Sequence, residues 1–176
     1  MLRWLCLFIT IGAAEAGELS GRVVRVHDGD TLTVLVSRKQ IKVRLLDIDA
    51  PERKQAFGTR SRESLAELCH GKDARVEWED KDRYGRTLGR VICAGVDVNA
   101  EQARRGMAWV YVRYAPKDSP LYAVQAEARA AKRGLWEHSN PVPPWVWRAK
   151  GRSQGKHAGA SPERAGRNKC PVMNLG

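Results

Sequence analysis

The chain has 176 residues, 43% of them hydrophobic, which provides room for one packed domain and argues against two. Its 31 Lys and Arg against 20 Asp and Glu give a formal net charge of +11, so we expect an acidic partner: nucleic acid, anionic lipid or another acidic polymer. Beyond the first residues no segment is long and apolar enough to cross a membrane, which argues against an integral membrane protein.

Residues 1–16 have the pattern of a secretory signal peptide. A positively charged start, MLR, precedes the apolar run WLCLFITIG, and AEA ends at Ala16 with the small residues of a cleavage site. The apolar run is too short to span a bilayer, and a buried N-terminal strand is the alternative. We therefore predict a soluble mature protein that begins at Gly17, has no membrane span, and is periplasmic or secreted.

Period-two alternation of apolar and polar residues predicts five short strands. Their sequences are RVVRVHD, DTLTVLV, KQIKVRLL, ARVEWE and RTLGRVIC. The gaps between them are too short for the crossovers of a parallel sheet. Helical patterns follow at residues 58–71, at 100–106, where Asn99 and Gln102 resemble a capping box, and at 121–131. These elements predict an α+β fold: an all-β core that forms a five-stranded OB-fold barrel, with about three helices inserted and appended.

The C-terminal part of the chain differs in composition from the predicted domain, residues 17–147. Residues 148–176 carry seven Lys and Arg against one Glu and are rich in Gly, Ser and Ala. Such a segment has little to bury, so we predict a basic, disordered tail whose cations are separate from any cleft of the domain. The stretch NPVPPWVW before it is expected to lay Trp145 and Trp147 against the domain.

Acidic residues gather where two predicted strands begin and end. Asp30 opens the second strand, whereas Asp49 and Glu52 directly follow the third. Antiparallel pairing of these strands is expected to bring Asp30 close to Asp49. Two carboxylates and a backbone carbonyl form an oxygen-only site of the kind that binds calcium or magnesium. A solvated acidic turn is the alternative.

Two arginines accompany these acids. Arg44 lies on the polar face of the third strand, and Arg86 follows the turn DRYG. A guanidinium group can bind two phosphate oxygens at once and stays charged at any working pH, so two of them facing a cation would hold a phosphodiester from both sides. A hairpin with incidental arginines is the alternative for Arg86.

The motifs together resemble the staphylococcal nuclease, or thermonuclease-like, family. DGDT, VRLLDIDAPE, DRYGRTLGRV, VNAEQARRGMAWV and EARAAKRGLW occur here in the order and approximate spacing of that family. The resemblance covers about residues 21–136. It implies an OB-type barrel with three helices and calcium-dependent cleavage of DNA and RNA at the 5′-oxygen, which leaves 3′-phosphate ends.

The resemblance also implies a role for individual residues. It makes Asp30 and Asp49 the carboxylate ligands of one calcium ion, together with the backbone carbonyl of Ala50, where the family's namesake has threonine. Glu52 is then the general base for the attacking water. The implied phosphate clamps and nucleotide contacts are Arg44 and Arg86, and Arg83, Tyr84 and Tyr114, respectively.

A non-catalytic nucleic-acid-binding OB-fold module is the competing hypothesis, because the same fold hosts both functions. Such a module would keep the aromatic residues and lose the acids, whereas this chain has both. An adhesin for anionic surfaces that relies on the basic tail is a third hypothesis. The residues imply DNA and RNA as substrates and no protein partner.

Three cysteines remain after the predicted signal peptide: Cys69, Cys93 and Cys170. Cys69 lies at the end of a predicted helix and Cys93 at the end of a predicted strand. In an oxidising compartment we predict a disulfide between these two residues. Two buried thiols are the alternative.

Overall fold

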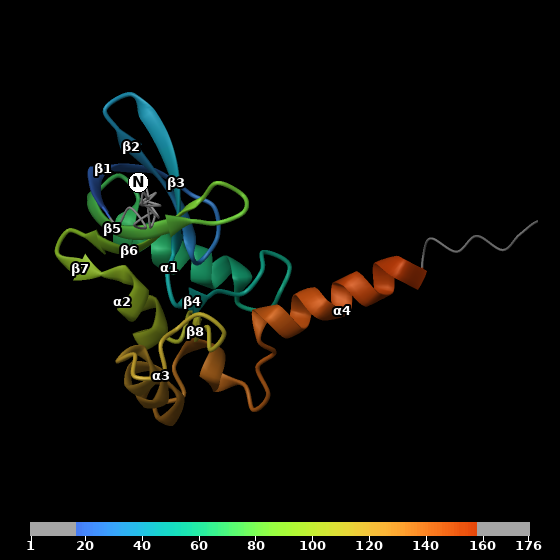
Figure 1. The fold of residues 1–176 in the computed structure, drawn as a ribbon. Coiled ribbons are helices and arrows are strands. Elements are labelled where there is room, and N and C mark those ends of the chain that lie inside the picture. Colours follow the sequence, from blue (N-terminus) through green and yellow to red (C-terminus); the bar gives the residue numbers. More distant parts are fainter. Residues whose placement is uncertain (1–16, 158–176) are drawn as a thin grey trace, which may run out of the picture.

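The computed structural model describes residues 17–157, with side chains up to residue 152. The predicted signal peptide and Cys170 lie outside these residues. The main sheet is closed into a barrel, because the strand order β3-β2-β1-β5-β6-β7 is completed by a parallel pairing of β3 with β6 (Figure 1). The strands of this sheet are β1 (Gly17–Val26), β2 (Thr31–Val36), β3 (Lys39–Leu45), β5 (Asp73–Lys81), β6 (Thr87–Cys93) and β7 (Val96–Asp97).

The barrel interior is filled by the apolar half of each alternating strand. Val23, Leu32, Val43 and Val76 are fully buried, as is Val91 of β6. Strand β1 is long enough to pair with β2 through one part and with β5 through another, which turns the sheet back on itself. The prediction of a five-stranded OB-type barrel with an α+β fold is confirmed.

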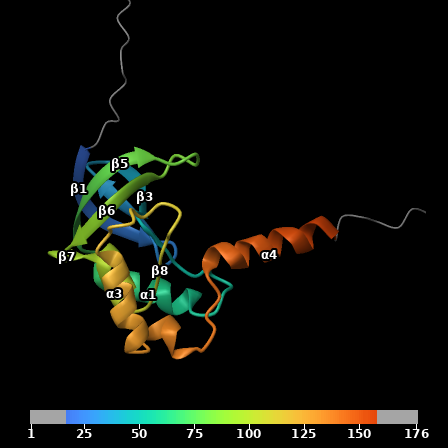
Figure 2. The same ribbon diagram turned by 60° about the horizontal axis from the view of Figure 1, so that its bottom comes forward.

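The helices lie on one side of the barrel together with a small second sheet (Figures 1 and 2). This sheet pairs β4 (Ile48–Asp49) with β8 (Trp109–Val110). The helices are α1 (Gly58–Cys69), α2 (Val98–Arg104), α3 (Leu121–Ala130) and α4 (Pro144–His157), with a 3-10 turn η1 at Gly134–Glu137. None of the helices within residues 17–157 has the length and apolarity that crossing a bilayer requires.

The capping box predicted for α2 is wrong. The N-cap residue is Asp97, whose side chain accepts a hydrogen bond from the Ala100 N–H at 3.2 Å. Asn99 is instead buried, where it accepts from the Val91 N–H at 3.0 Å and donates to the Leu46 carbonyl at 2.9 Å. Burial of an amide side chain requires such partners, so Asn99 ties the helix to the barrel.

The predicted disulfide is present between Cys69 at the end of α1 and Cys93 at the end of β6. Both residues are buried, and their Cα atoms are 5.4 Å apart. The bridge spans 24 positions of sequence and fastens α1 to the barrel. Closing a loop of this length in the unfolded chain stabilises the fold by about 3 kcal/mol in the chain-entropy account.

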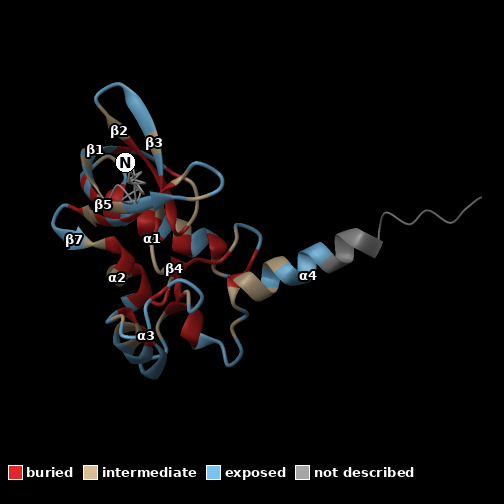
Figure 3. Cartoon of the chain, viewed as in Figure 1, coloured by how far each residue is buried: buried red, intermediate tan, exposed pale blue. Residues whose placement is uncertain are grey.

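Helix α4 corrects the boundary expected at residue 147. The prediction placed a disordered tail from Arg148 onward, but α4 begins at Pro144 and continues to His157. Proline suits the first turn of a helix because its missing N–H has no helical partner there. The start of α4 packs against the domain, and residues 149–152 of the helix are exposed (Figure 3). Residues 158–176 of the expected tail lie outside the described residues.

Candidate active site

Asp30 is held inside the turn between β1 and β2 by its neighbours. Its Oδ2 accepts a hydrogen bond from the Ala50 N–H at 2.6 Å, and its Oδ1 accepts one from the Thr31 hydroxyl at 3.0 Å. Gly29 makes this close approach possible, because a Cβ there would lie 1.7 Å from the Ser61 Oγ. The glycine of the DGD motif is therefore needed to bring β2 against the chain that follows β4.

Gln102 fixes the same turn from below. Its Nε2 donates to the Gly29 carbonyl at 2.7 Å and to the Ser61 carbonyl at 3.1 Å. The side chain is fully buried, so its hydrogen bonds are not exchanged with water. Gln102 thus positions the DGD turn, a role that differs from the helix cap expected from its place in the sequence.

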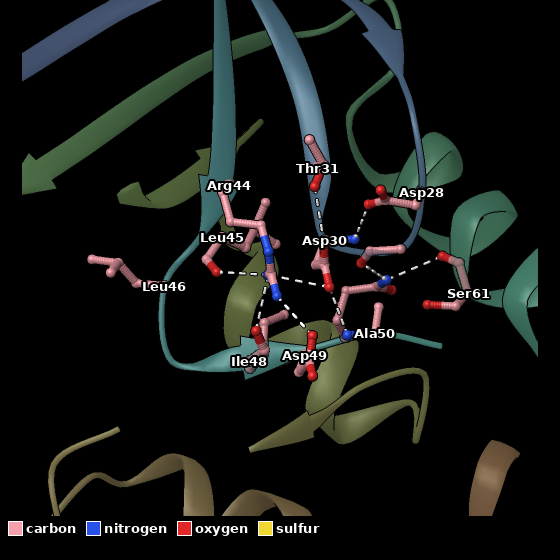
Figure 4. A network of polar contacts seen from close by, with 12 residues as sticks. Asp28, Asp30, Thr31, Arg44, Leu45, Leu46, Ile48, Asp49, Ala50 and Ser61 are labelled. Atoms are coloured by element: carbon pink, nitrogen blue, oxygen red, sulfur yellow. Dashed lines mark hydrogen bonds and ion pairs between the residues drawn. The ribbon is translucent and has the colours of Figure 1, made fainter. Parts of the chain in front are cut away.

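Arg44 joins the two buried aspartates. Its Nη1 lies 3.1 Å from Asp30 Oδ2 and its Nη2 lies 2.9 Å from Asp49 Oδ1, as Figure 4 shows. The Nη1 group also donates to the Ile48 carbonyl at 2.9 Å. Asp30 and Asp49 are 5% and 1% exposed, so each charge is compensated by a guanidinium group rather than by water. The expected juxtaposition of the two carboxylates is therefore present, with Arg44 between them.

Asp28 is a member of this acidic group that the sequence analysis did not include. Its Oδ1 accepts a hydrogen bond from the Asp30 N–H at 3.1 Å. Burial and the charge of Asp30 raise the pKa of the Asp28 carboxyl to about 7. The repeated aspartate in DGD was the available signal, because two carboxylates two positions apart across a tight turn face a shared environment.

Asp28→Asn is expected to stabilise the cation-free protein at high pH. The pKa of Asp28 is higher in the folded chain than its ordinary value of 3.8. The Asp28 carboxyl therefore loses its proton at a lower pH in the unfolded chain than in the folded chain. Because of this difference, the free energy of unfolding falls as pH rises from about 4 to 7. Asparagine keeps the hydrogen-bond acceptor without the charge, so the gain should be near zero at pH 4 and roughly 1–3 kcal/mol at pH 8.

Urea unfolding in the presence of a chelator, at pH 4, 5.5 and 8, measures this gain. Asp118→Asn, at an exposed position, is the matched control and should give no pH-dependent difference. A gain for Asp28→Asn that is the same at all three pH values would contradict the titration of Asp28.

Arg148 of α4 is the second site residue that the sequence analysis missed. Its Nη2 lies 2.8 Å from Asp49 Oδ2, and its Nη1 lies 3.2 Å from Asp49 Oδ1 and 2.8 Å from Glu52 Oε1. The expectation that the C-terminal cations are separate from the cleft is therefore wrong at Arg148. Sequence offered only a weak signal, a single arginine after a tryptophan pair, because the contact joins positions 99 apart.

Burial and the neighbouring arginines shift the pKa of Asp49 in opposite directions. Burial raises the pKa of the Asp49 carboxyl, although Arg148 and Arg44 act in the other direction. Burial on its own would lower the pKa of the Arg148 guanidinium, but its hydrogen bonds to Asp49 and Glu52 raise it. Arg148 thus remains charged, and it neutralises a carboxylate that water does not reach.

The donor set here suits a hard cation. Within residues 17–152 no three His, Cys, Asp or Glu side chains form a metal-binding cluster. The residues that could contribute oxygen ligands to a cation are Asp30 and Asp49 through their carboxylates and Ala50 through its backbone carbonyl. Calcium and magnesium accept such all-oxygen sets. Asp30 and Asp49 are of the right ligand type, and their oxygens are paired here with Arg44 and Arg148.

Arg86, Arg83 and Tyr84 form a separate group at the tip of the β5–β6 hairpin. Arg86 pairs with Asp82, its Nη2 lying 2.6 Å from Asp82 Oδ2. The guanidinium carbons of Arg83 and Arg86 lie 4.8 and 5.6 Å from the centroid of the Tyr84 ring, which is 69% exposed. Arg86 is thus engaged by its own turn, unlike Arg44, which contacts the acids directly.

Tyr114 belongs to a third group near the start of α4. Its ring lies 4.9 Å from that of Tyr111, which in turn stacks on Trp145 at 5.3 Å and 8°. Tyr114 is 65% exposed, whereas Trp147 is 41% exposed and does not cover the domain as expected. An exposed aromatic ring beside a basic surface can stack on a nucleic-acid base.

The arrangement brings together what hydrolysis of a phosphodiester requires. Glu52, whose carboxylate water can reach, shares the Arg148 guanidinium with the buried Asp49. Arg44 in turn links Asp49 to Asp30. Carboxylates and guanidinium groups in such proximity are the group types that could accept a proton, bind a cation and contact phosphate oxygens.

Comparisons with known proteins lead in the same direction. A family described as "Staphylococcal nuclease homologue" matches residues 42–138. An uncharacterized endonuclease of Escherichia coli O157:H7 is 48% identical over 145 residues, which cover 82% of this chain and 94% of that protein. A micrococcal nuclease of Shigella flexneri is 45% identical over 142 residues, covering 74% and 81%. A probable staphylococcal-like nuclease, CAN1, of Oryza sativa subsp. japonica is 37% identical over 113 residues, covering 64% and 34%.

Proposed function

Since the chain belongs to the staphylococcal nuclease family and is a nuclease, we propose that it cleaves DNA and RNA at the 5′-oxygen with one calcium ion and leaves 3′-phosphate ends. The observation that carries this proposal is the convergence of Asp30, Asp49 and Glu52 through two shared arginines. A barrel that only bound nucleic acid would not need buried carboxylates, which cost free energy unless they are compensated.

Asp30 and Asp49 are the residues proposed to hold the calcium ion, with the Ala50 carbonyl. A bound calcium ion would neutralise charge on a non-bridging oxygen of the scissile phosphate. Both carboxylates are fixed by hydrogen bonds to the backbone or to Arg44, so their oxygens are oriented before any ligand arrives. The contribution of the protein is this preorganised pair.

Glu52 is the proposed general base. Its side chain is 43% exposed, so water can reach its carboxylate, in contrast to Asp49. The turn that carries it is packed tightly, because a Cβ at Gly58 would lie 2.1 Å from the Glu52 carbonyl oxygen. A fixed carboxylate beside a phosphate can accept the proton of an attacking water, whose oxygen bonds to phosphorus while the bond to the 5′-oxygen breaks and that oxygen takes up a proton from solvent.

Arg44 and Arg86 are the proposed phosphate clamps. Arg44 can exchange a carbonyl contact for a phosphate oxygen without leaving the acids, since Nη1 donates to the carbonyls of Leu45 and Ile48 as well. Asp82 holds Arg86 through Nε and Nη2, at 2.7 and 2.6 Å from its Oδ2, so Nη1 is the group proposed to reach a phosphate oxygen. Arg83 and Tyr84 of the same hairpin are proposed to contact the nucleotide, as is Tyr114.

A basic hollow next to the acids supports a polyanionic substrate. It is lined by Arg25, Arg53 and Arg62, along with His27, Asp28 and the first residues of α1, and has a volume of about 560 Å³. None of the three arginines forms an ion pair with a residue of the described part of the chain. Positive groups without acidic partners are available to the phosphates that flank the scissile one.

Replacing Arg25 and Arg62 by alanine is expected to lower the affinity for a long single-stranded oligonucleotide. Each lost phosphate contact should reduce the slope of log affinity against log salt by about 0.7. Fluorescence anisotropy in calcium-free buffer, from 50 to 300 mM salt, measures the slope. The pair Arg90 and Arg104, engaged by acidic partners elsewhere, is the matched control. An unchanged slope in the variant that lacks Arg25 and Arg62 would show that the hollow does not contact the phosphates of the substrate.

Export to the periplasm or the medium is proposed along with this activity. The signal-peptide pattern of residues 1–16 supports it, and so does the disulfide between Cys69 and Cys93, because such bonds persist in oxidising compartments.

The test of the proposed function is cleavage of DNA and RNA followed by analysis of the product ends. We expect fragments whose 5′-hydroxyl groups accept a labelled phosphate from a kinase without prior phosphatase treatment. Fragments that need phosphatase first would contradict attack that expels the 5′-oxygen. Binding without any cleavage would favour the alternative, a non-catalytic nucleic-acid-binding module.

A further inference from the structure

Arg148 of α4 donates hydrogen bonds to the Asp49 oxygens that are proposed to bind calcium. Both oxygens of Asp49 accept hydrogen bonds from Arg148, and Oδ1 also accepts one from Arg44 at 2.9 Å. The Asp49 side chain is only 1% exposed. A cation that coordinates Asp49 therefore has to displace Arg148.

The same guanidinium holds the proposed base. Arg148 Nη1 lies 2.8 Å from Glu52 Oε1, a distance typical of a charge-assisted hydrogen bond. This contact occupies Oε1, one of the two Glu52 oxygens that could accept a proton from water. One side chain thus blocks the metal ligand and the base together.

We propose that Arg148 is an internal competitor of calcium: α4 closes the site in the cation-free protein, and calcium opens it. This inference rests on the proposed function, because it takes Asp49 as a calcium ligand. Arginine and calcium exclude each other here because each requires the same two oxygens. The affinity for calcium is then reduced by the fraction of molecules in which Arg148 is bound.

The attachment of α4 allows such an exchange while the start of the helix stays in place. Trp145 stacks on Tyr111 at 5.3 Å, and the Val142 carbonyl just before the helix accepts from Gln55 Nε2 at 2.5 Å. Trp145 and Arg148 are three positions apart and share a helix face. The first turn of α4 therefore stays anchored when Arg148 dissociates from Asp49 and Glu52, and an Arg148 variant retains the contacts of Trp145 and Val142.

Calcium binding to the full chain in the absence of nucleic acid tests the competition. We expect Arg148→Ala and Arg148→Gln to bind calcium about tenfold more tightly than the unsubstituted protein, as measured by isothermal titration calorimetry with calcium chloride. Arg152→Ala is the matched control: it removes the same charge from an exposed position of the same helix and should bind like the unsubstituted protein.

Hydrogen exchange provides a second measurement that is independent of activity. Reciprocity requires calcium to loosen α4, so saturating calcium should speed the exchange of amides in residues 148–152 of the unsubstituted protein. The Arg148 variants should show fast exchange with and without calcium.

Calcium binding and hydrogen exchange together test whether Arg148 and calcium compete for Asp49. Unchanged or weaker calcium binding in both Arg148 variants overturns the competition, and intact calcium-dependent cleavage in the same variants would leave the proposed function standing. Protection of α4 by calcium overturns it as well, because Arg148 would then support the loaded site. No calcium binding by any of the proteins overturns both the competition and the proposed function.

Discussion

Glu52→Gln is expected to cleave DNA at least about a hundredfold more slowly than the unsubstituted protein, while it still binds calcium and nucleotide. Glutamine has the shape and hydrogen-bonding capacity of glutamate but does not accept a proton from the attacking water. The backbone of residue 52 is fixed by its turn, in which its carbonyl accepts from the Gln55 N–H at 2.8 Å, so the fold should be unaffected. Initial cleavage rates at saturating calcium and substrate measure this loss.

Glu63→Gln is the matched control for Glu52→Gln. Glu63 is exposed on α1 and should tolerate the change with no effect on rate. If Glu52→Gln cleaves DNA at nearly the parent rate, the acids of the DIDAPE stretch are a charged turn and the base must be sought elsewhere. A parallel loss of calcium affinity would instead make Glu52 a ligand.

Asp30→Asn is expected to weaken calcium binding by about tenfold or more, because an anionic ligand of a hard cation is replaced by a neutral one. The asparagine oxygen can still accept the Ala50 N–H, which Asp30 Oδ2 accepts at 2.6 Å, so the DGD turn should be retained. Cleavage at low calcium should fall accordingly. Calorimetry of calcium binding and cleavage rates over a calcium titration measure both effects.

Excess calcium separates Asp30→Asn from Glu52→Gln. It should restore part of the activity of Asp30→Asn and almost none of the activity of Glu52→Gln, because only the first defect is one of occupancy. Asp118→Asn is the control for a change of charge at an exposed aspartate. Equal rescue of the two variants would mean that Asp30 and Glu52 do not have the separate roles proposed.

The barrel could be predicted from the sequence because its signals are local. Strands such as Thr31–Val36 and Thr87–Cys93 alternate visibly, and the gaps between them exclude crossover connections. The pairing of Cys69 with Cys93 was predictable from their places at the ends of neighbouring elements. The approach of Asp30 to Asp49 followed from antiparallel pairing of β2 with β3.

Contacts between distant positions could not be predicted in the same way. Asn99 and Gln102 have the spacing of a capping box, yet tertiary packing buries both amides against backbone groups of other elements. The composition of residues 148–157 indicates a solvated tail, and Arg148 becomes part of the site only because Trp145 stacks on Tyr111 and orients the helix. Asp82 likewise holds Arg86 through a turn contact that the motif alone does not reveal.

The central claim is that one calcium ion, held by Asp30 and Asp49, is required for cleavage. Its most direct test is plasmid cleavage by chelator-treated protein during a calcium titration, with bound calcium measured by equilibrium dialysis in the same samples. We predict no cleavage in the chelator, one ion bound per chain at saturation, and a cleavage rate that rises with occupancy. Full cleavage by protein that holds no calcium would contradict the claim.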